Sequence, residues 1–96
     1  FEGKDFRARG TTTADGFVVF KESLVSKKTN SSLTTSLLNM RNKLMSENII
    51  DSSYSFTKDY IFSSPSTAAS IISGNSTNGK TAWRNLQGMT LRDYEN

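Results

Sequence analysis

The sequence contains no cysteine and no histidine among its 96 residues. Without cysteine the chain forms no disulfide, and without either residue type it has no Cys- or His-ligated zinc site. A Ser–His or Cys–His nucleophile pair is excluded for the same reason. We therefore expect no metal, no cofactor and no catalysis of these kinds.

Long apolar runs are also missing. No run approaches the roughly 18 to 20 residues that a membrane-spanning helix needs, so we expect no membrane partner. A surplus of one charge sign is small, with 12 Lys and Arg against 9 Asp and Glu and a net charge of +3. This balance permits weak attraction to nucleic acid but is not diagnostic of it. The absence of cysteine fits the cytosol, and we expect a cytoplasmic protein.

The length and composition predict one globular domain. Hydrophobic residues make up 34% and charged residues 22% of the chain, which is a globular composition on the polar side. The sequence opens on Phe1 and not on Met. We expect residues 1–96 to be a single domain, excised from the C-terminal part of a longer protein.

The N-terminal part predicts an antiparallel hairpin. Residues 5–12 alternate, with Phe6 and Ala8 on one face and Arg7 and Arg9 on the other, as in a half-buried strand. Ala-Asp-Gly then forms a turn signal. The following GFVVFKES is rich in β-branched and aromatic residues, and we expect this second strand to continue toward Leu24 and Val25.

Two helices are predicted further along the chain. Leucines and methionines recur at helical spacing from Leu33 to Met45 and predict a long amphipathic helix over about 32–47. Ser64-Pro65 predicts the start of a second helix, because Ser accepts hydrogen bonds at the N-cap and Pro suits the first helical position. Gly74 lies where a helix C-cap belongs.

The remaining elements complete the predicted fold. Residues 54–62 predict two short strand pieces broken near Lys58-Asp59, residues 80–84 a strand that carries Trp83, and Thr90 the cap of a final helical turn. We therefore predict an α+β fold. It combines a small antiparallel sheet of about four or five short strands with one long helix and one or two short helices.

GNSTNGKT, residues 74–81, fits the phosphate-loop pattern G-x-x-x-x-G-K-[ST]. A phosphate loop follows a buried strand and opens a helix, so that backbone N–H groups converge on phosphate. Here the predicted order is reversed, because Gly74 ends a helix and Asn78-Gly79 turns the chain into a strand. We interpret the match as accidental and expect no bound ATP or GTP.

Basic residues are the stronger candidates for a binding site. Arg7 and Arg9 share a strand face, Lys80 and Arg84 lie on or near another strand, and such side chains contact phosphates. Lys27, Lys28 and Lys58 would join them if the fold brought them together. The alternative is a solvated charged face.

The predicted second helix adds a candidate phosphate site at its N-terminus. Ser64 and Ser66 lie at this end, where free amides attract an anion. Asn78 and Thr81 lie near Lys80 in the sequence and could add polar contacts. The carboxylates do not form a catalytic pair, because Asp15, Asp59 and Asp93 each have a structural explanation.

The aromatic residues admit two interpretations. They could stack nucleobases, but a domain this small needs most of them as core. Trp83 is the strongest candidate for a core anchor, and its indole N–H needs a partner. The residues in question are Phe17, Phe20, Phe56, Tyr60, Phe62 and Trp83.

Three segments together resemble a bacterial family, domain of unknown function 4357. They are DGFVV at 15–19, FTKDYIFSSPSTAAS at 56–70 and GNSTNGKTAW at 74–83. The resemblance covers about 70 residues between roughly 7 and 85 and is far more specific than the phosphate-loop pattern. One departure is Asn48-Ile49 at the end of the long helix, where similar chains often carry Gly.

The resemblance implies a role in DNA processing. Such domains commonly lie at the C-terminus of GIY-YIG nuclease-like proteins or occur in restriction–methylation systems. We expect a non-catalytic accessory module that binds DNA weakly or positions a nuclease, with DNA or its own N-terminal domain as partner. The alternative is a protein-interaction or structural domain that contacts no nucleic acid. The expected phosphate and polar contacts are Arg7, Arg9, Ser64, Ser66, Asn78, Lys80, Thr81 and Arg84.

Overall fold

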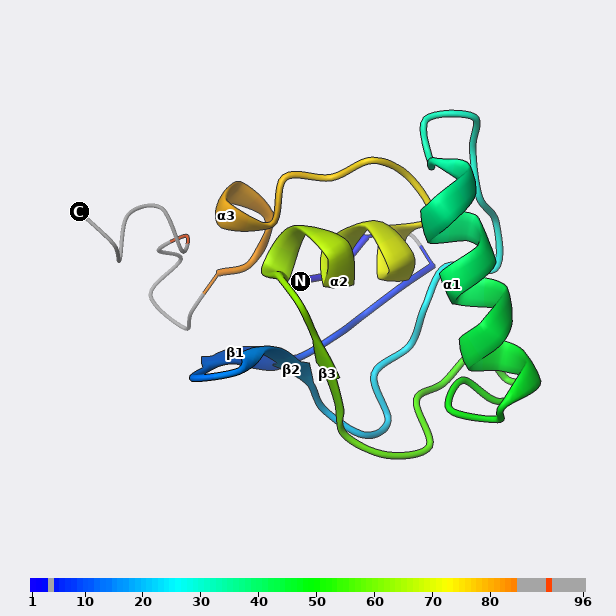
Figure 1. The fold of residues 1–96 in the computed structure, drawn as a ribbon, viewed down its shortest axis with the longest axis horizontal. Helices are drawn as coiled ribbons and strands as arrows, with labels where there is room; N and C mark the ends of the chain where they lie inside the picture. The colour runs from blue at the N-terminus through cyan, green and yellow to red at the C-terminus, as the bar shows by residue number, and fades with distance from the viewer. Residues whose placement is uncertain (4, 85–89, 91–96) are drawn as a thin grey trace.

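The protein is an α+β domain with a three-stranded antiparallel sheet in the part that the structure, a computed structural model, describes. Residues 1–3, 5–84 and 90 are described. The elements follow one another as β1 (Gly10–Thr13), β2 (Gly16–Val19), α1 (Thr35–Ser46), β3 (Tyr60–Phe62), α2 (Pro65–Ser73) and α3 (Gly79–Ala82). Figure 1 shows α2 at the centre, with the sheet on one side of it and α1 on another.

The hairpin forms at the predicted turn, but its first strand begins at Gly10 and not near residue 5, and its second strand ends at Val19. β1 pairs with β2 in an antiparallel register that sets Thr13 opposite Gly16 and Gly10 opposite Val19. The second strand does not continue to Leu24 and Val25 as predicted. The chain turns after Phe20, and Lys21 N–H donates to Asp59 Oδ1 at 2.7 Å, so a loop replaces the end of the strand.

The third strand joins the other edge of β2. β3 pairs with β2 in an antiparallel register that places Phe17 opposite Phe62 and Val19 opposite Tyr60. Of the expected four or five strands, three are present among residues 1–3, 5–84 and 90. Other extended pieces make only isolated bridges, such as Ile50 with Phe56, because each is too short to continue a ladder.

α1 is shorter than the predicted helix over 32–47. It runs from Thr35 to Ser46, and its N-cap is Thr34, whose side chain accepts from Leu37 N–H. The helix begins after the predicted residue 32, and Leu33 is buried before it begins. After the C-cap Glu47, Asn48 takes a positive φ of 59°. Asparagine tolerates this left-handed conformation, in which glycine is the usual residue.

α2 matches its sequence signals and is the central helix. Ser64 is its N-cap, Pro65 its first residue, and Gly74 its C-cap with a φ of 78°. Its residues from Ala68 to Ser73 are all buried, because α2 contacts α1, α3, β2 and β3. A helix that is apolar on most of its surface needs such enclosure.

The prediction of a strand over residues 80–84 is wrong. Residues Gly79–Ala82 form the short helix α3, with Ala82 N–H donating to Asn78 O at 3.0 Å and Trp83 N–H to Gly79 O at 3.2 Å. The Asn-Gly pair therefore begins a helical turn where a hairpin-like turn was expected. The final turn predicted from Thr90 falls on residues outside those described.

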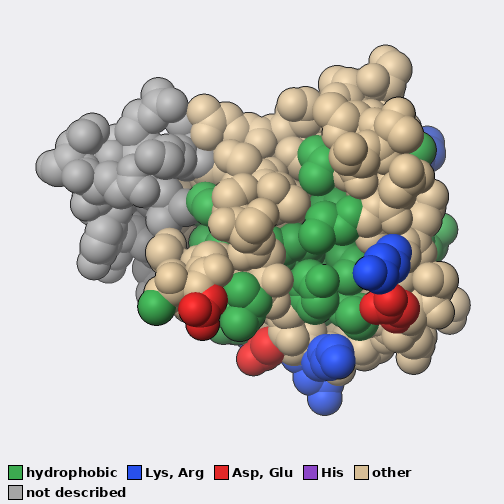
Figure 2. Space-filling view, viewed as in Figure 1, with side chains coloured by type: hydrophobic (Ala, Val, Ile, Leu, Met, Phe, Trp, Pro, Cys, Tyr) green, Lys and Arg blue, Asp and Glu red, His purple; other side chains and the backbone are tan. Residues whose placement is uncertain are grey.

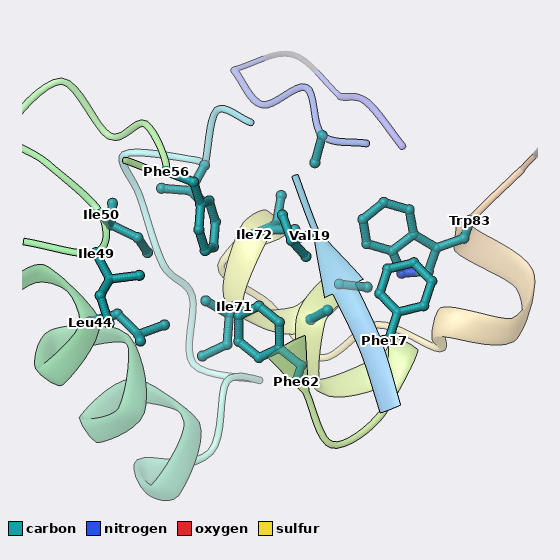
Figure 3. Packing of buried hydrophobic residues seen from close by; sticks show 14 residues of the cluster. Phe17, Val19, Leu44, Ile49, Ile50, Phe56, Phe62, Ile71, Ile72 and Trp83 are labelled. Carbon is teal, nitrogen blue, oxygen red and sulfur yellow. The ribbon is translucent and has the colours of Figure 1, made fainter. Parts of the chain in front are cut away.

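The hydrophobic core runs from the sheet through α2 to α1. Trp83 packs against Phe17 with ring centroids 4.5 Å apart at one end, and Leu44, Ile49 and Ile50 lie at the other, beside α1 (Figure 3). The indole N–H of Trp83 donates to Pro65 O at 3.0 Å, so the predicted core anchor has its partner. Most of the aromatic residues considered for base stacking are thus core, since Phe17, Phe56, Phe62 and Trp83 are buried.

Candidate nucleic-acid interface

Two segments that flank the hairpin lie side by side. Arg7 N–H donates to Leu24 O at 3.1 Å, and Leu24 N–H donates back to Arg7 O at 2.7 Å. This antiparallel bridge aligns residues 5–9 with residues 21–28. We call the two segments, with their basic residues Arg7, Arg9, Lys21, Lys27 and Lys28, the basic ladder.

One end of the basic ladder gathers two arginines and a lysine. Arg7, Arg9 and Lys21 line one hollow of about 180 Å³, together with Glu22. All three basic residues are exposed. Arg7 and Arg9 point outward because Phe6 and Ala8, which alternate with them, point inward, as the alternation predicts. The structure therefore confirms that Arg7 and Arg9 share a face and adds Lys21, which sequence reasoning missed.

Arg7 has an acidic neighbour. Its Nε lies 3.0 Å from Glu2 Oε2, and both side chains are more than half exposed, at 77% and 64%. An ion pair this exposed contributes little to stability. Glu2 therefore holds the Arg7 guanidinium only weakly.

The other end of the basic ladder is organised by Asp5. Its Oδ2 accepts from Ser26 Oγ at 2.8 Å and from Lys27 N–H at 3.2 Å. The Ser26 hydrogen bond, more than the Lys27 amide and the nearby charge of Lys28, lowers the pKa of the Asp5 carboxyl. Asp5 thus stays ionised at neutral pH and fixes the loop that carries both lysines.

The dimensions of the basic ladder suit several phosphates. Asp5 and Arg9 are four positions apart, which at about 3.3 Å per residue is about 13 Å. Phosphates of one strand rise about 3.4 Å each along the duplex axis, so a segment of this length can lie beside more than one phosphate. Five basic side chains lie near four acidic ones, Glu2, Asp5, Glu22 and Asp59, and the last of these accepts from Lys21 N–H. This leaves a small surplus of positive charge along the basic ladder.

Two of the predicted contact residues have structural roles instead. Ser64 Oγ caps α2 by accepting from Thr67 N–H at 3.1 Å, and Ser66 Oγ accepts from Gly79 N–H at 2.8 Å. α3 lies against the first turn of α2, so closely that a Cβ on Gly79 would collide with the Pro65 backbone. The predicted phosphate site at the α2 N-terminus is therefore covered by α3.

The other predicted contacts lie in or next to α3 in the sequence. Asn78 and Arg84 are exposed, and Arg84 bridges to Thr90. Lys80 and Thr81 belong to α3, but their side chains lie outside the described part of the structure. The basic ladder thus contains two of the eight predicted contact residues, Arg7 and Arg9, and joins them to Lys21, Lys27 and Lys28.

The phosphate-loop pattern lacks the surroundings that such a loop requires. Gly74 ends α2 in a left-handed conformation and donates to Ser70 O at 2.9 Å. A helix thus precedes the motif where a phosphate loop has a strand, and the helix that follows spans four residues. The hydroxyl groups of Ser73 and Thr77 hydrogen-bond to each other, with Oγ and Oγ1 2.9 Å apart. The segment is therefore a connector between two helices.

Sequence reasoning also missed the buried Arg41, which is 3% exposed. Its Nη1 donates to Ile71 O at 2.7 Å and its Nη2 to Ser26 O. Burial lowers the pKa of the guanidinium, while Tyr54 and Asp5 raise it. Arg41 joins α1 to α2 and to the lysine-bearing loop. Its place on the apolar stripe of α1, one turn after Leu37, was the available signal.

A second exposed surface is apolar. Met40, Leu44 and Tyr60 line a hollow of about 320 Å³ between α1 and β3, together with the polar Ser36, Asn39, Lys43 and Glu47. Figure 2 shows hydrophobic side chains gathered across this face, with charged side chains at its lower edge. We call this surface the helix–strand groove.

Two absences hold for the described residues. Within 1–3, 5–84 and 90, Asp and Glu do not form a group of three or more that could hold a metal ion. In the same part of the chain, each helix is too short or too polar to cross a bilayer.

The fold and these surfaces define a small α+β domain with a basic ladder and an apolar groove. The model of the family described as domain of unknown function (DUF4357) matches residues 1–95, so the chain belongs to this family. No curated protein and no solved structure matches the chain.

Proposed function

We propose that this domain is a non-catalytic accessory module that binds the phosphate backbone of DNA through its basic ladder. One observation carries the proposal: the Arg7–Leu24 bridge aligns Arg7 and Arg9 with Lys21, Lys27 and Lys28 on exposed backbone segments. Arginine and lysine on such segments contact phosphates and position a protein on DNA without reading sequence.

The cellular role follows from the resemblance to domains that accompany GIY-YIG nuclease-like or restriction–methylation proteins. A weak and sequence-independent contact suits a module that holds a catalytic domain near DNA, because the catalytic domain then supplies specificity. We place such a module in the cytoplasm and assign it no cofactor.

The test is binding of a fluorescein-labelled duplex measured by anisotropy at low salt. Wild-type protein should raise the anisotropy, and Arg7→Gln combined with Arg9→Gln should weaken binding by more than tenfold, since each lost phosphate contact contributes about 1 kcal/mol. Lys43→Gln is the matched control, because Lys43 lies on α1 beside the helix–strand groove. Equal binding by the double variant and the wild type would remove the basic ladder from the account.

The second candidate is a protein-interaction domain, and the helix–strand groove favours it. Met40 and Tyr60 line this groove and are half-buried, and accessible apolar patches mark interaction sites. The partner in this interpretation is the domain's own N-terminal neighbour. Absence of binding to any duplex or single strand at low salt, together with loss of docking in Met40→Glu, would favour this candidate over the first.

A further inference from the structure

The basic ladder ends at a larger hollow. This hollow measures about 740 Å³ and lies between the N-terminal segment, the loop after β2 and the end of α2. Its volume falls in the range of small-molecule sites. We call it the loop hollow, and the side chains that matter for its chemistry are those of Asp5, Phe6, Lys27, Lys28, Asn30 and Asn75.

The loop hollow offers an aromatic surface held in place. Phe6 is half-buried and packs against Phe1 with ring centroids 4.8 Å apart. A ring that is fixed and yet borders a hollow can stack a planar group, and nucleobases stack on aromatic side chains with little dependence on base identity.

Its polar groups are mainly hydrogen-bond donors. Asn30 Oδ1 accepts from Ser32 N–H at 2.9 Å, and Asn75 Oδ1 accepts from Thr77 Oγ1 at 2.8 Å. Both amide oxygens are therefore engaged within the protein. The two Nδ2 groups make no hydrogen bond among the described residues, so each amide presents its donor side to a ligand.

Charge completes the arrangement. Lys27 and Lys28 border the loop hollow and are exposed, and Asp5 uses Oδ2 for Ser26 and Lys27. One carboxylate oxygen thus remains to accept a hydrogen bond, beside two ammonium groups. The set comprises a flat ring, two amide donors, one acceptor and two cations, which suits a planar heterocycle that carries a phosphate.

We propose that the loop hollow binds one nucleoside monophosphate unit, with its base against Phe6, its base edge or sugar on the Asn30 and Asn75 amides, and its phosphate on Lys27 and Lys28. The proposal rests on the proposed function for its source, an unpaired nucleotide of a DNA strand that follows the basic ladder. From the phosphate-loop pattern it uses Gly74 as a wall residue and the Asn75 amide as a donor, and it does not involve Lys80 or Thr81, on which binding of ATP or GTP by such a loop would depend.

The test is nuclear magnetic resonance titration with deoxyadenosine monophosphate, a short oligothymidylate and a duplex. We expect the amide resonances of residues 5–6, 27–30 and 73–75 to shift with the oligothymidylate. Shifts with the mononucleotide as well would mean that a free nucleotide is also a source. If neither ligand moves these resonances, the proposal is wrong.

Two variants make the test specific. Asn75→Asp keeps the acceptor that Thr77 uses and removes the donor, and should weaken oligothymidylate binding roughly 2- to 10-fold. Phe6→Leu removes the stacking surface and should weaken it roughly 5- to 100-fold. Phe6 also packs on Phe1, so binding by Phe6→Leu is interpreted only if this variant still unfolds cooperatively. If it does not, the test rests on Asn75→Asp alone. Wild-type affinity in Asn75→Asp overturns the proposal.

The outcome is separable from that of the proposed function. If the duplex binds through Arg7 and Arg9 while the loop-hollow variants bind oligothymidylate normally, the backbone contact stands and the loop hollow fails. If the oligothymidylate binds in the loop hollow and Arg7→Gln with Arg9→Gln changes nothing, the loop hollow stands and the basic ladder fails.

Discussion

The Arg41 guanidinium donates from Nη1 to the backbone oxygen of Ile71 at 2.7 Å, inside the junction between α1 and α2. Ile71 lies in a buried turn of the central helix, and a second donor of Arg41 reaches Ser26 O, in the loop of the basic ladder. One buried side chain therefore connects the helical core to the segment that we assign to DNA.

Arg41→Lys should destabilise the fold by about 1–3 kcal/mol, because a single ammonium cannot replace the two-pronged donor and leaves a buried carbonyl without its partner. Urea unfolding measures the difference. The matched control is Lys43→Gln on the exposed side of the same helix, expected within about 0.5 kcal/mol of wild type. A change in Arg41→Lys as small as that of the control would contradict this role.

Asp5 should make stability depend on pH at the acid end. Its pKa is lowered in the folded state from 3.8, chiefly by the Ser26 hydrogen bond. The ionised carboxylate therefore stabilises the fold above pH 3.8, and this contribution is lost as the pH falls through the folded pKa. The melting temperature of wild type should exceed that of Asp5→Asn at neutral pH, and the difference should close in strong acid. A difference that persists unchanged in strong acid would show that the charge is not responsible.

Asn48 supplies a test of the ending of α1. With a φ of 59°, Asn48→Ala should cost about 1 kcal/mol, because a Cβ is disfavoured in the left-handed region and alanine lacks the local hydrogen bonding of asparagine. Asn48→Gly, the residue expected from similar chains, should be as stable as wild type or more so. Equal losses in both variants, measured by thermal unfolding, would mean that the Asn48 side chain and not its backbone matters.

Gly79 tests why the phosphate-loop pattern is present. Gly79→Ala should destabilise the domain by about 1–3 kcal/mol, since the added Cβ meets the Pro65 backbone and a packed backbone yields poorly. Ser76→Ala, in the exposed part of the same connector, serves as the control. Unchanged stability of Gly79→Ala would refute the structural explanation of this glycine.

Features set by neighbouring residues in the sequence were predicted correctly, whereas features set by contacts between distant residues were not. The start and end of α2 were read correctly because Ser64, Pro65 and Gly74 act through their immediate neighbours. The end of β2 was not, because the capture of Lys21 N–H by Asp59 joins positions 38 residues apart. α3 was mistaken for a strand because its packing on Pro65, and not its own sequence, selects a helical turn.

The candidate site divides in the same way. Alternation along one strand placed Arg7 and Arg9 together, but their alignment with Lys21 and Lys27 depends on the bridge to Leu24, which the sequence does not reveal. Ser64 and Ser66 were chosen for a free helix N-terminus, and tertiary packing covers that end. The burial of Arg41 was not predicted because arginine is usually exposed. Its burial depends on two backbone oxygens, those of Ile71 and Ser26, which only the folded chain brings to it.

The salt dependence of duplex binding tests the central claim most directly. Each phosphate contact lowers the slope of log K against log salt by about 0.9, so the basic ladder should give a slope of about −3 to −4. Arg7→Gln with Arg9→Gln should make it shallower by about 2, and Lys43→Gln should leave it unchanged. No duplex binding at low salt, or a slope that the double variant does not alter, would contradict the assignment of the basic ladder to DNA.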